Sequence, residues 1–155
     1  MKASIDHGRL IPVEEMTGED AEETAQLRLT LGEARSYLAN FPWCRSIERE
    51  FFGLGVGGVV SVFLFQINCD EGVDDTLWVV CGDLPTAYLV PDQAPTPGAA
   101  LSVYCVLMDE WIAAVRGKGD LSSVFPVAAK PTETNAVQLQ KRIAFLRSEV
   151  IPAFQ

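Results

Sequence analysis

The sequence predicts an α+β domain: a mainly antiparallel sheet of four or five strands, with two long C-terminal helices packed on one face. Three observations lead to this prediction. An almost unbroken apolar run, Val59–Ile67, is followed by an acidic loop and a second apolar run, Leu77–Cys81. A helical pattern then begins at Thr96–Pro97, and another begins at Thr132.

The two apolar runs are interpreted as a buried β-hairpin with strands at 59–68 and 76–82. Strand side chains alternate between the two faces of a sheet, which divides the first strand into two apolar sets. One set is Val60, Val62 and Leu64, and the other is Val59, Phe63, Phe65 and Ile67. Because both sets are apolar, both faces must be covered. The helix before Pro42, or a second copy of the chain, is expected to cover the face that the C-terminal helices leave.

Two further strands are expected, at Ser46–Phe52 and Ala87–Val90, and the mixed polarity of the first is typical of an edge strand. The segment Gly53–Gly58 matches the dinucleotide-binding pattern G-x-G-x-x-G. In that fold the glycines open a helix whose first amides bind the pyrophosphate. Here a strand follows instead, so the glycines are predicted to form a tight turn or a bulge.

Two helices are predicted in the C-terminal part of the chain. The first has Thr96 as its cap, Pro97 at its first position and Gly117 at its end. Its apolar residues recur at three- and four-residue steps: Leu101, Tyr104, Cys105, Met108, Trp111, Ile112 and Val115. Thr132 is expected to cap the last helix, which Pro152 ends. The apolar residues of that helix are Leu139, Ile143, Leu146 and Val150.

Residues 1–24 are predicted to form a flexible acidic arm, and residues 25–155 a single α+β domain. The alternation in Leu27–Leu31 favours a short strand, followed by a helix that Thr30 and Glu33 cap and that ends near Leu38. A rival start at Thr17 with Asp20 would instead give one longer helix. The first arrangement is the one we expect.

Composition restricts the choice of partner. The net charge is −9, and between Arg49 and Arg116 there are nine acidic residues but no lysine or arginine. Such a field repels nucleic acids and anionic lipids, which proteins bind mainly through Lys and Arg. The longest apolar stretch, Leu54–Phe65, contains three glycines and is shorter than the roughly 20 residues of a membrane-spanning helix. The start of the sequence lacks the apolar core of a secretory signal. We therefore expect a cytoplasmic location, with no nucleic-acid or membrane partner.

The sequence offers little for catalysis. A serine or cysteine nucleophile needs a base, and the single histidine, His7, lies in the predicted arm. The four cysteines are too far apart for a local zinc site and are expected to be free and mostly buried: Cys44, Cys69, Cys81 and Cys105. The acidic loop at 70–75 lacks the spacing of an EF-hand. No catalytic residue, metal or cofactor is predicted.

One turn is a candidate ligand site. Asp83 follows a buried strand directly, and loops at strand ends often carry functional groups. Aromatic residues expected nearby complete the candidate set: Trp78, Tyr88, Tyr104 and Trp111. The competing interpretation is that Asp83 caps the turn and the rings fill the core.

The segments Val60–Phe65 and Leu77–Val90, with the helix through Met108 and Trp111, resemble a group of small bacterial proteins of unknown function. The resemblance covers most of the chain after Leu29. It implies no activity, cofactor or catalytic residue, and its motifs are core and turn positions.

The leading hypothesis is a non-catalytic protein-interaction domain with an immunity-like or regulatory role, whose exposed sheet face or edge binds a partner or forms a homodimer. The alternative is a small-molecule binder or enzyme that uses Asp83 and Tyr88. The alternative predicts a concave pocket at the end of the strand, and a closed surface there would count against it.

Overall fold

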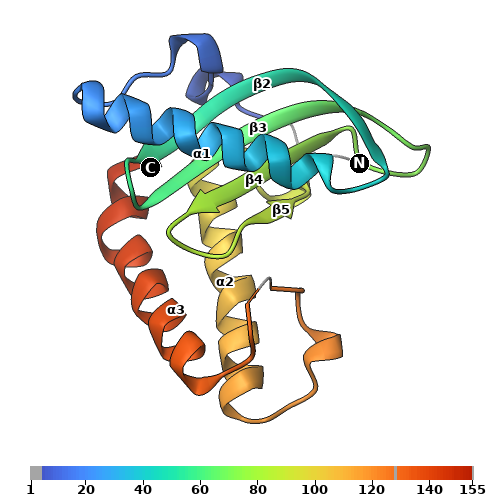
Figure 1. The fold of residues 1–155 in the computed structure, drawn as a ribbon, viewed down its shortest axis with the longest axis vertical. Coiled ribbons are helices and arrows are strands. Elements are labelled where there is room, and N and C mark those ends of the chain that lie inside the picture. Colours follow the sequence, from blue (N-terminus) through green and yellow to red (C-terminus); the bar gives the residue numbers. More distant parts are fainter. Residues whose placement is uncertain (1–4, 128, 155) are drawn as a thin grey trace.

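A computed structural model describes residues 5–127 and 129–154 and shows an α+β fold with a five-stranded antiparallel sheet (Figure 1). The strands are β1 (Ile11–Pro12), β2 (Cys44–Val56), β3 (Val60–Cys69), β4 (Thr76–Gly82) and β5 (Ala87–Leu89). Their spatial order follows their order in the chain, so each strand pairs with its sequence neighbour. The predicted hairpin and the short strand after it are confirmed.

The helices cover both faces of this sheet. They are α1 (Ala21–Ala39), α2 (Pro97–Arg116) and α3 (Glu133–Phe145). Figure 1 shows α1 crossing one face and α2 lying behind the other. A second copy of the chain is therefore not required to cover either face.

The alternation of the hairpin predicts its two faces almost completely. Val60, Val62 and Leu64 belong to the core under α2. Phe63, Phe65 and Ile67 belong to the core under α1. Val59 is the exception, because it lies in the turn before β3, where its amide donates to Val56 O at 2.9 Å, and its side chain packs on the α2 side.

The glycine-rich segment is a bulge and a turn, as predicted. The β2–β3 register shifts between Phe52 and Leu54, which places a bulge at Gly53. Gly58 has a φ of 77° in the turn that joins the strands, a conformation that favours glycine. The outer edge of β2 pairs with β1 only at Phe51 and Phe52.

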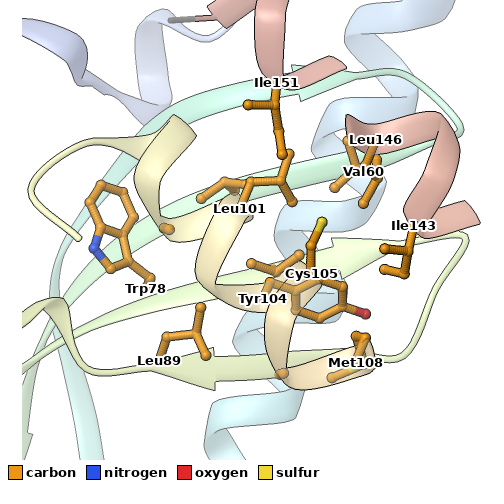
Figure 2. Packing of buried hydrophobic residues seen from close by; sticks show 14 of the residues in the cluster. Val60, Trp78, Leu89, Leu101, Tyr104, Cys105, Met108, Ile143, Leu146 and Ile151 are labelled. Atoms are coloured by element: carbon orange, nitrogen blue, oxygen red, sulfur yellow. The ribbon is translucent and has the colours of Figure 1, made fainter. Parts of the chain in front are cut away.

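Helix α2 is the centre of the larger core cluster. Thr96 Oγ1 accepts a hydrogen bond from Ala99 N at 3.1 Å, so the predicted cap is present. Leu101, Tyr104, Cys105 and Met108 pack between the strands and the C-terminal turns (Figure 2). By length and composition α2 could span a membrane, but the core helix of a globular protein meets the same criteria.

Helix α3 does not lie on the sheet beside α2, which corrects one part of the predicted architecture. It packs mainly against α2 and runs alongside it (Figure 1). Its buried residues, Ala136, Leu139 and Ile143, form a narrow apolar stripe. A stripe of this width can be covered by a single neighbouring element. The turns that follow, 146–150 and 151–154, add Leu146 and Ile151 to the core over the sheet, to which Ile143 of α3 also belongs (Figure 2).

The predicted short strand at 27–31 is wrong, because these residues belong to the long helix α1. The one longer helix of the rival arrangement is the one that forms, but its cap is Asp20 and not Thr17. Asp20 Oδ1 accepts from Glu23 N, and Glu23 Oε1 accepts from Glu19 N, both at 2.8 Å. Leu27 and Leu31 are buried and Leu29 is 65% exposed. A helix places residues 27 and 31 on one face and residue 29 on another, so the apolar alternation was coincidental.

The segment predicted as an acidic arm packs on the domain through three buried residues. Leu10, Val13 and Met16 are buried, and α1 already begins at Ala21, before the predicted boundary at residue 25. Residues 1–4 lie outside the described part of the chain.

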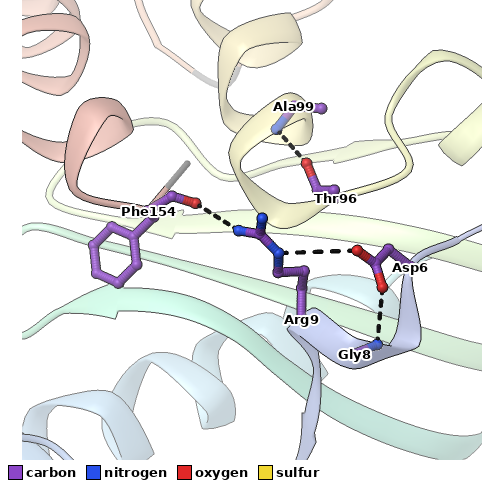
Figure 3. A network of polar contacts seen from close by, with 6 residues as sticks. All are labelled: Asp6, Gly8, Arg9, Thr96, Ala99 and Phe154. Atoms are coloured by element: carbon purple, nitrogen blue, oxygen red, sulfur yellow. Dashed lines mark hydrogen bonds and ion pairs between the residues drawn. The ribbon is translucent and has the colours of Figure 1, made fainter.

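Polar contacts join this segment to the last described turn of the chain, as Figure 3 shows, and to the residues that precede α2. Arg9 Nε lies 3.9 Å from Asp6 Oδ2, and Arg9 Nη1 donates to Phe154 O at 3.5 Å. Asp6 N also donates to Pro95 O at 2.8 Å, next to the start of α2. The first described turn thus contacts the last one.

Candidate functional site

Asp83 is positioned by the close approach of two turns. Gly82 has a φ of 136°, and a Cβ there would lie 2.5 Å from Val59 O, so only glycine fits. The next amide, Asp83 N, donates to the same carbonyl at 3.0 Å. The β4–β5 turn is therefore held against the β2–β3 turn, and the Asp83 side chain stays 70% exposed.

A groove lies between these two turns and α3. Its larger part has a volume of about 440 Å³ and is bounded by Val59, Leu84, Phe145 and Leu146 together with polar residues of α3. A smaller part of about 180 Å³ extends toward Trp111. The two parts share Asp83, Leu84, Gln138 and Arg142, and together we call them the Asp83 groove. A concavity thus exists where the small-molecule hypothesis predicts one.

The polar groups of the groove carry a local positive charge. Arg142 Nε and Nη2 both donate to one oxygen, Asp83 Oδ2, at 3.4 and 3.3 Å. Arg142 Nη1 donates to Gln138 O at 3.3 Å. Lys141 lines the groove without an ion pair to any described residue. Two cations and one carboxylate leave a net charge of +1 there.

Three of the predicted aromatic site residues are core residues. Trp78 is fully buried and its Nε1 donates to Ala94 O at 2.8 Å. Tyr104 is also fully buried, and its hydroxyl donates to Pro85 O at 2.7 Å. Burial raises the pKa of Tyr104, which keeps the phenol neutral. Trp111 is 3% exposed and reaches only one wall of the smaller part of the groove.

Tyr88 lies apart from Asp83, on the α1 side of the sheet. It belongs to a group of four half-buried rings, the Tyr88 cluster: Tyr37, Phe41, Trp43 and Tyr88. Phe41 and Trp43 are stacked with ring centroids 4.9 Å apart, and Tyr88 meets both edge-on at 5.3 Å. Burial raises the pKa of Tyr37, opposed by a hydrogen bond with the Tyr88 backbone.

The acidic β3–β4 loop borders this cluster. Asp70 N donates to Trp43 O at 3.2 Å, and Arg45 pairs with Asp70 at 2.6 Å. The carboxylates of the loop are Asp70, Glu71, Asp74 and Asp75. Arg45 and Asp70 form the ion pair described at this loop. Among the described residues, no group of three or more His, Cys, Asp or Glu side chains could hold a metal ion.

The structure offers no thiol nucleophile in its core. Burial raises the pKa of Cys81 to about 12 and that of Cys105 to about 11, so both thiols are protonated at neutral pH. Cys44 and Cys69 are half-buried and opposite each other on β2 and β3, and all four cysteines are free. His7 lies against Phe51, with ring centroids 6.2 Å apart.

Sequence reasoning missed the residues that surround Asp83 and Tyr88. Lys141 and Arg142 are adjacent cations in an acidic chain, and Phe145 lies off the apolar stripe of its helix. These two features could have indicated a ligand site on α3. Near Tyr88 the signal was the density of aromatic residues at 37–43. Neither signal shows which strand end or sheet face the residues approach.

Comparison with protein families, with curated proteins and with solved structures found no match for this chain. The resemblance to small bacterial proteins stays a prediction, and function is argued from the geometry.

Proposed function

We propose that this chain is a non-catalytic protein-interaction domain, and that the Tyr88 cluster with the acidic loop at 70–75 is its docking surface for a basic segment of a partner protein. The observation that carries the proposal is that the half-buried rings stand next to a carboxylate-rich loop, which the backbone hydrogen bond from Asp70 N to Trp43 O joins to them. A regulatory or immunity-like role in the cytoplasm, without nucleic acid or membrane, is part of the same proposal.

The two halves of this surface suit one kind of partner. Tyr and Trp are enriched in the cores of protein interfaces because they bury a large rigid area at low entropic cost. Their faces also attract Arg and Lys, an interaction of about 0.5–2 kcal/mol per contact. The carboxylates beside them accelerate encounter with a basic segment and disfavour acidic ones.

Other docking modes are less favourable. Both sheet faces are covered, by α1 and by α2, so binding through an open sheet face is not available. No described strand pairs with the outer edge of β2 over 44–50, and Arg45, Glu48 and Arg49 are exposed along it. Charged side chains on an edge oppose the addition of another strand.

The proposal is tested by the binding of short fluorescent peptides of the same length and opposite charge to the full chain. A peptide of alternating Lys or Arg and Leu is expected to bind, and its Glu counterpart is not. Tyr88→Ala is expected to weaken binding about tenfold, as for an interface aromatic, whereas Leu29→Ala, an exposed apolar residue on α1, leaves it unchanged.

Charge reversals separate docking from general attraction to an acidic protein. The two variants compared are Glu71→Lys and Glu22→Lys. Glu71 is in the loop at 70–75, Glu22 is on α1, and both side chains are exposed. The proposal requires Glu71→Lys to weaken peptide binding much more than Glu22→Lys. Equal weakening by the two substitutions would show that only net charge acts, and the docking surface would be refuted.

A further inference from the structure

We infer that the Asp83 groove is a binding site for a small amphiphilic carboxylate, whose head contacts Arg142 and Lys141 and whose apolar part lies along Val59, Leu84 and Phe145. This site is independent of the docking surface, because the β4–β5 turn and the loop at 70–75 lie at opposite ends of the sheet (Figure 1).

The shape of the groove suits an elongated ligand. Its larger part, about 440 Å³, falls in the range of roughly 300–1,000 Å³ that is typical of small-molecule pockets. The smaller part of about 180 Å³ continues from it past Asp83. Phe145 is 45% exposed here, while its neighbours Ile143 and Leu146 are in the core. Its ring is therefore an apolar surface that folding leaves free for a ligand.

The guanidinium of Arg142 has capacity for a further acceptor. Two of its nitrogens converge on a single oxygen of Asp83 at 3.3–3.4 Å, which is longer than charge-assisted hydrogen bonds usually are. A ligand carboxylate could instead bind side by side to two N–H groups, the geometry that guanidinium favours. Lys141 supplies a second cation on the same helix.

The charge balance indicates a monoanion. A cationic amphiphile would meet a local charge of +1 and a single competing carboxylate, Asp83. An anion with several charges would be repelled by the net charge of −9 on the whole chain. One carboxylate satisfies the two cations with the least repulsion.

The probe for this site is octanoate, titrated into the full chain by calorimetry or NMR. Three control compounds test the contributions of the carboxylate and of the alkyl tail separately. Acetate has the carboxylate without the tail, octanol has the tail without the charge, and octylammonium has the tail with the opposite charge. Octanoate is expected to bind about tenfold or more tightly than each of them. Octylammonium binding as tightly as octanoate would overturn the inference.

Substitutions then locate the site. Arg142→Ala and Phe145→Ala are each expected to weaken octanoate binding about tenfold, consistent with the loss of one charge-assisted contact or one apolar wall. Asp83→Asn is expected to tighten binding, because it removes the carboxylate that competes for Arg142. Arg28→Ala is the matched control, since it removes one exposed positive charge on α1.

Two results would contradict the assignment. The first is that Arg142→Ala and Phe145→Ala bind octanoate with the affinity of the wild type. Circular dichroism shows beforehand that both variants are folded. The other is binding only to vesicles that contain anionic lipid, with none to dissolved octanoate, which would indicate a membrane surface and not a free ligand.

Discussion

Single residues fix the turn on which the groove depends. Gly82 combines a φ of 136° with a Cβ position 2.5 Å from a backbone oxygen, whereas Gly72 has a φ of 88° and nothing within 4 Å of its Cβ position. Both glycines are strained by any side chain, but only Gly82 also meets an obstacle that cannot move aside.

We therefore predict that Gly82→Ala lowers the free energy of unfolding by about 3 kcal/mol, and Gly72→Ala by about 1 kcal/mol. Urea denaturation of the two variants and the wild type measures the difference, which reports the clash with Val59 O. Equal losses for the two variants would contradict the close approach of the turns.

A buried phenol and two buried thiols make the stability of the protein depend on pH. Burial raises the pKa of Tyr104 above its ordinary 10.0, and that of Cys81 and Cys105 above 9.0. Well below pH 9 these groups are protonated in both the folded and the unfolded state, so they leave the free energy of unfolding constant. Above it the unfolded chain loses their protons first and the folded chain retains them, so stability falls as pH rises.

Urea denaturation at a series of pH values between 7 and 11 is expected to show this fall in the free energy of unfolding. In the variant Tyr104→Phe with Cys81→Ala and Cys105→Ala, the curve is expected to be flatter, although the variant is less stable at pH 7 because it loses the hydrogen bond to Pro85 O. An equally steep loss in the variant would assign the effect to other groups.

At the scale of elements, α1 shows where sequence patterns are ambiguous. Residues 27–31 fit a strand by alternation and a helix by four-residue spacing, and two capping patterns compete for the helix start. The contacts of Asp20, Glu23 and Gly57 decide in favour of the long helix: Glu23 Oε2 also accepts from Gly57 N at 3.0 Å, in the β2–β3 turn. That long-range contact has no local signal.

The helical assignment predicts opposite outcomes for two leucines. Leu27→Ala is expected to lower the free energy of unfolding by about 3 kcal/mol, because the Leu27 side chain is only 1% exposed. Leu29→Ala is expected to lower it by less than about 0.5 kcal/mol, because Leu29 is 65% exposed. Thermal or urea unfolding of both variants is the measurement. A strand at 27–31 would place both side chains on one face and make the two losses similar.

The hairpin and α2 could be predicted because their signals are long and mutually consistent: continuous apolar alternation in one, and a Thr-Pro start with a glycine end in the other. The position of α3 could not, since an apolar stripe shows that a helix is buried but not against which element. For the same reason Asp83 was identified without Arg142, and Tyr88 was placed with Asp83 although β5 turns its side chain to the opposite face.

At the scale of the whole molecule, the two candidate sites lie at opposite ends of the sheet and differ in the charges that line them. The end with the Tyr88 cluster carries the acidic loop, and the end with the Asp83 groove carries Lys141 and Arg142. From residue 117 onward, five basic and three acidic residues give a net charge of +2, within a chain of net charge −9. The side chains that line the two sites are therefore suited to ligands of opposite charge.

The central claim is that the Tyr88 cluster and the acidic loop form one docking surface for a basic segment. Its most direct test is an NMR titration of the isotope-labelled full chain with the alternating basic peptide. The predicted result is a set of shifted amides confined to 37–43, 70–75 and the surroundings of Tyr88, with the groove residues unaffected. Shifts spread over all acidic surfaces, including Glu14, Glu15 and Glu22, or no shifts at all, would contradict it.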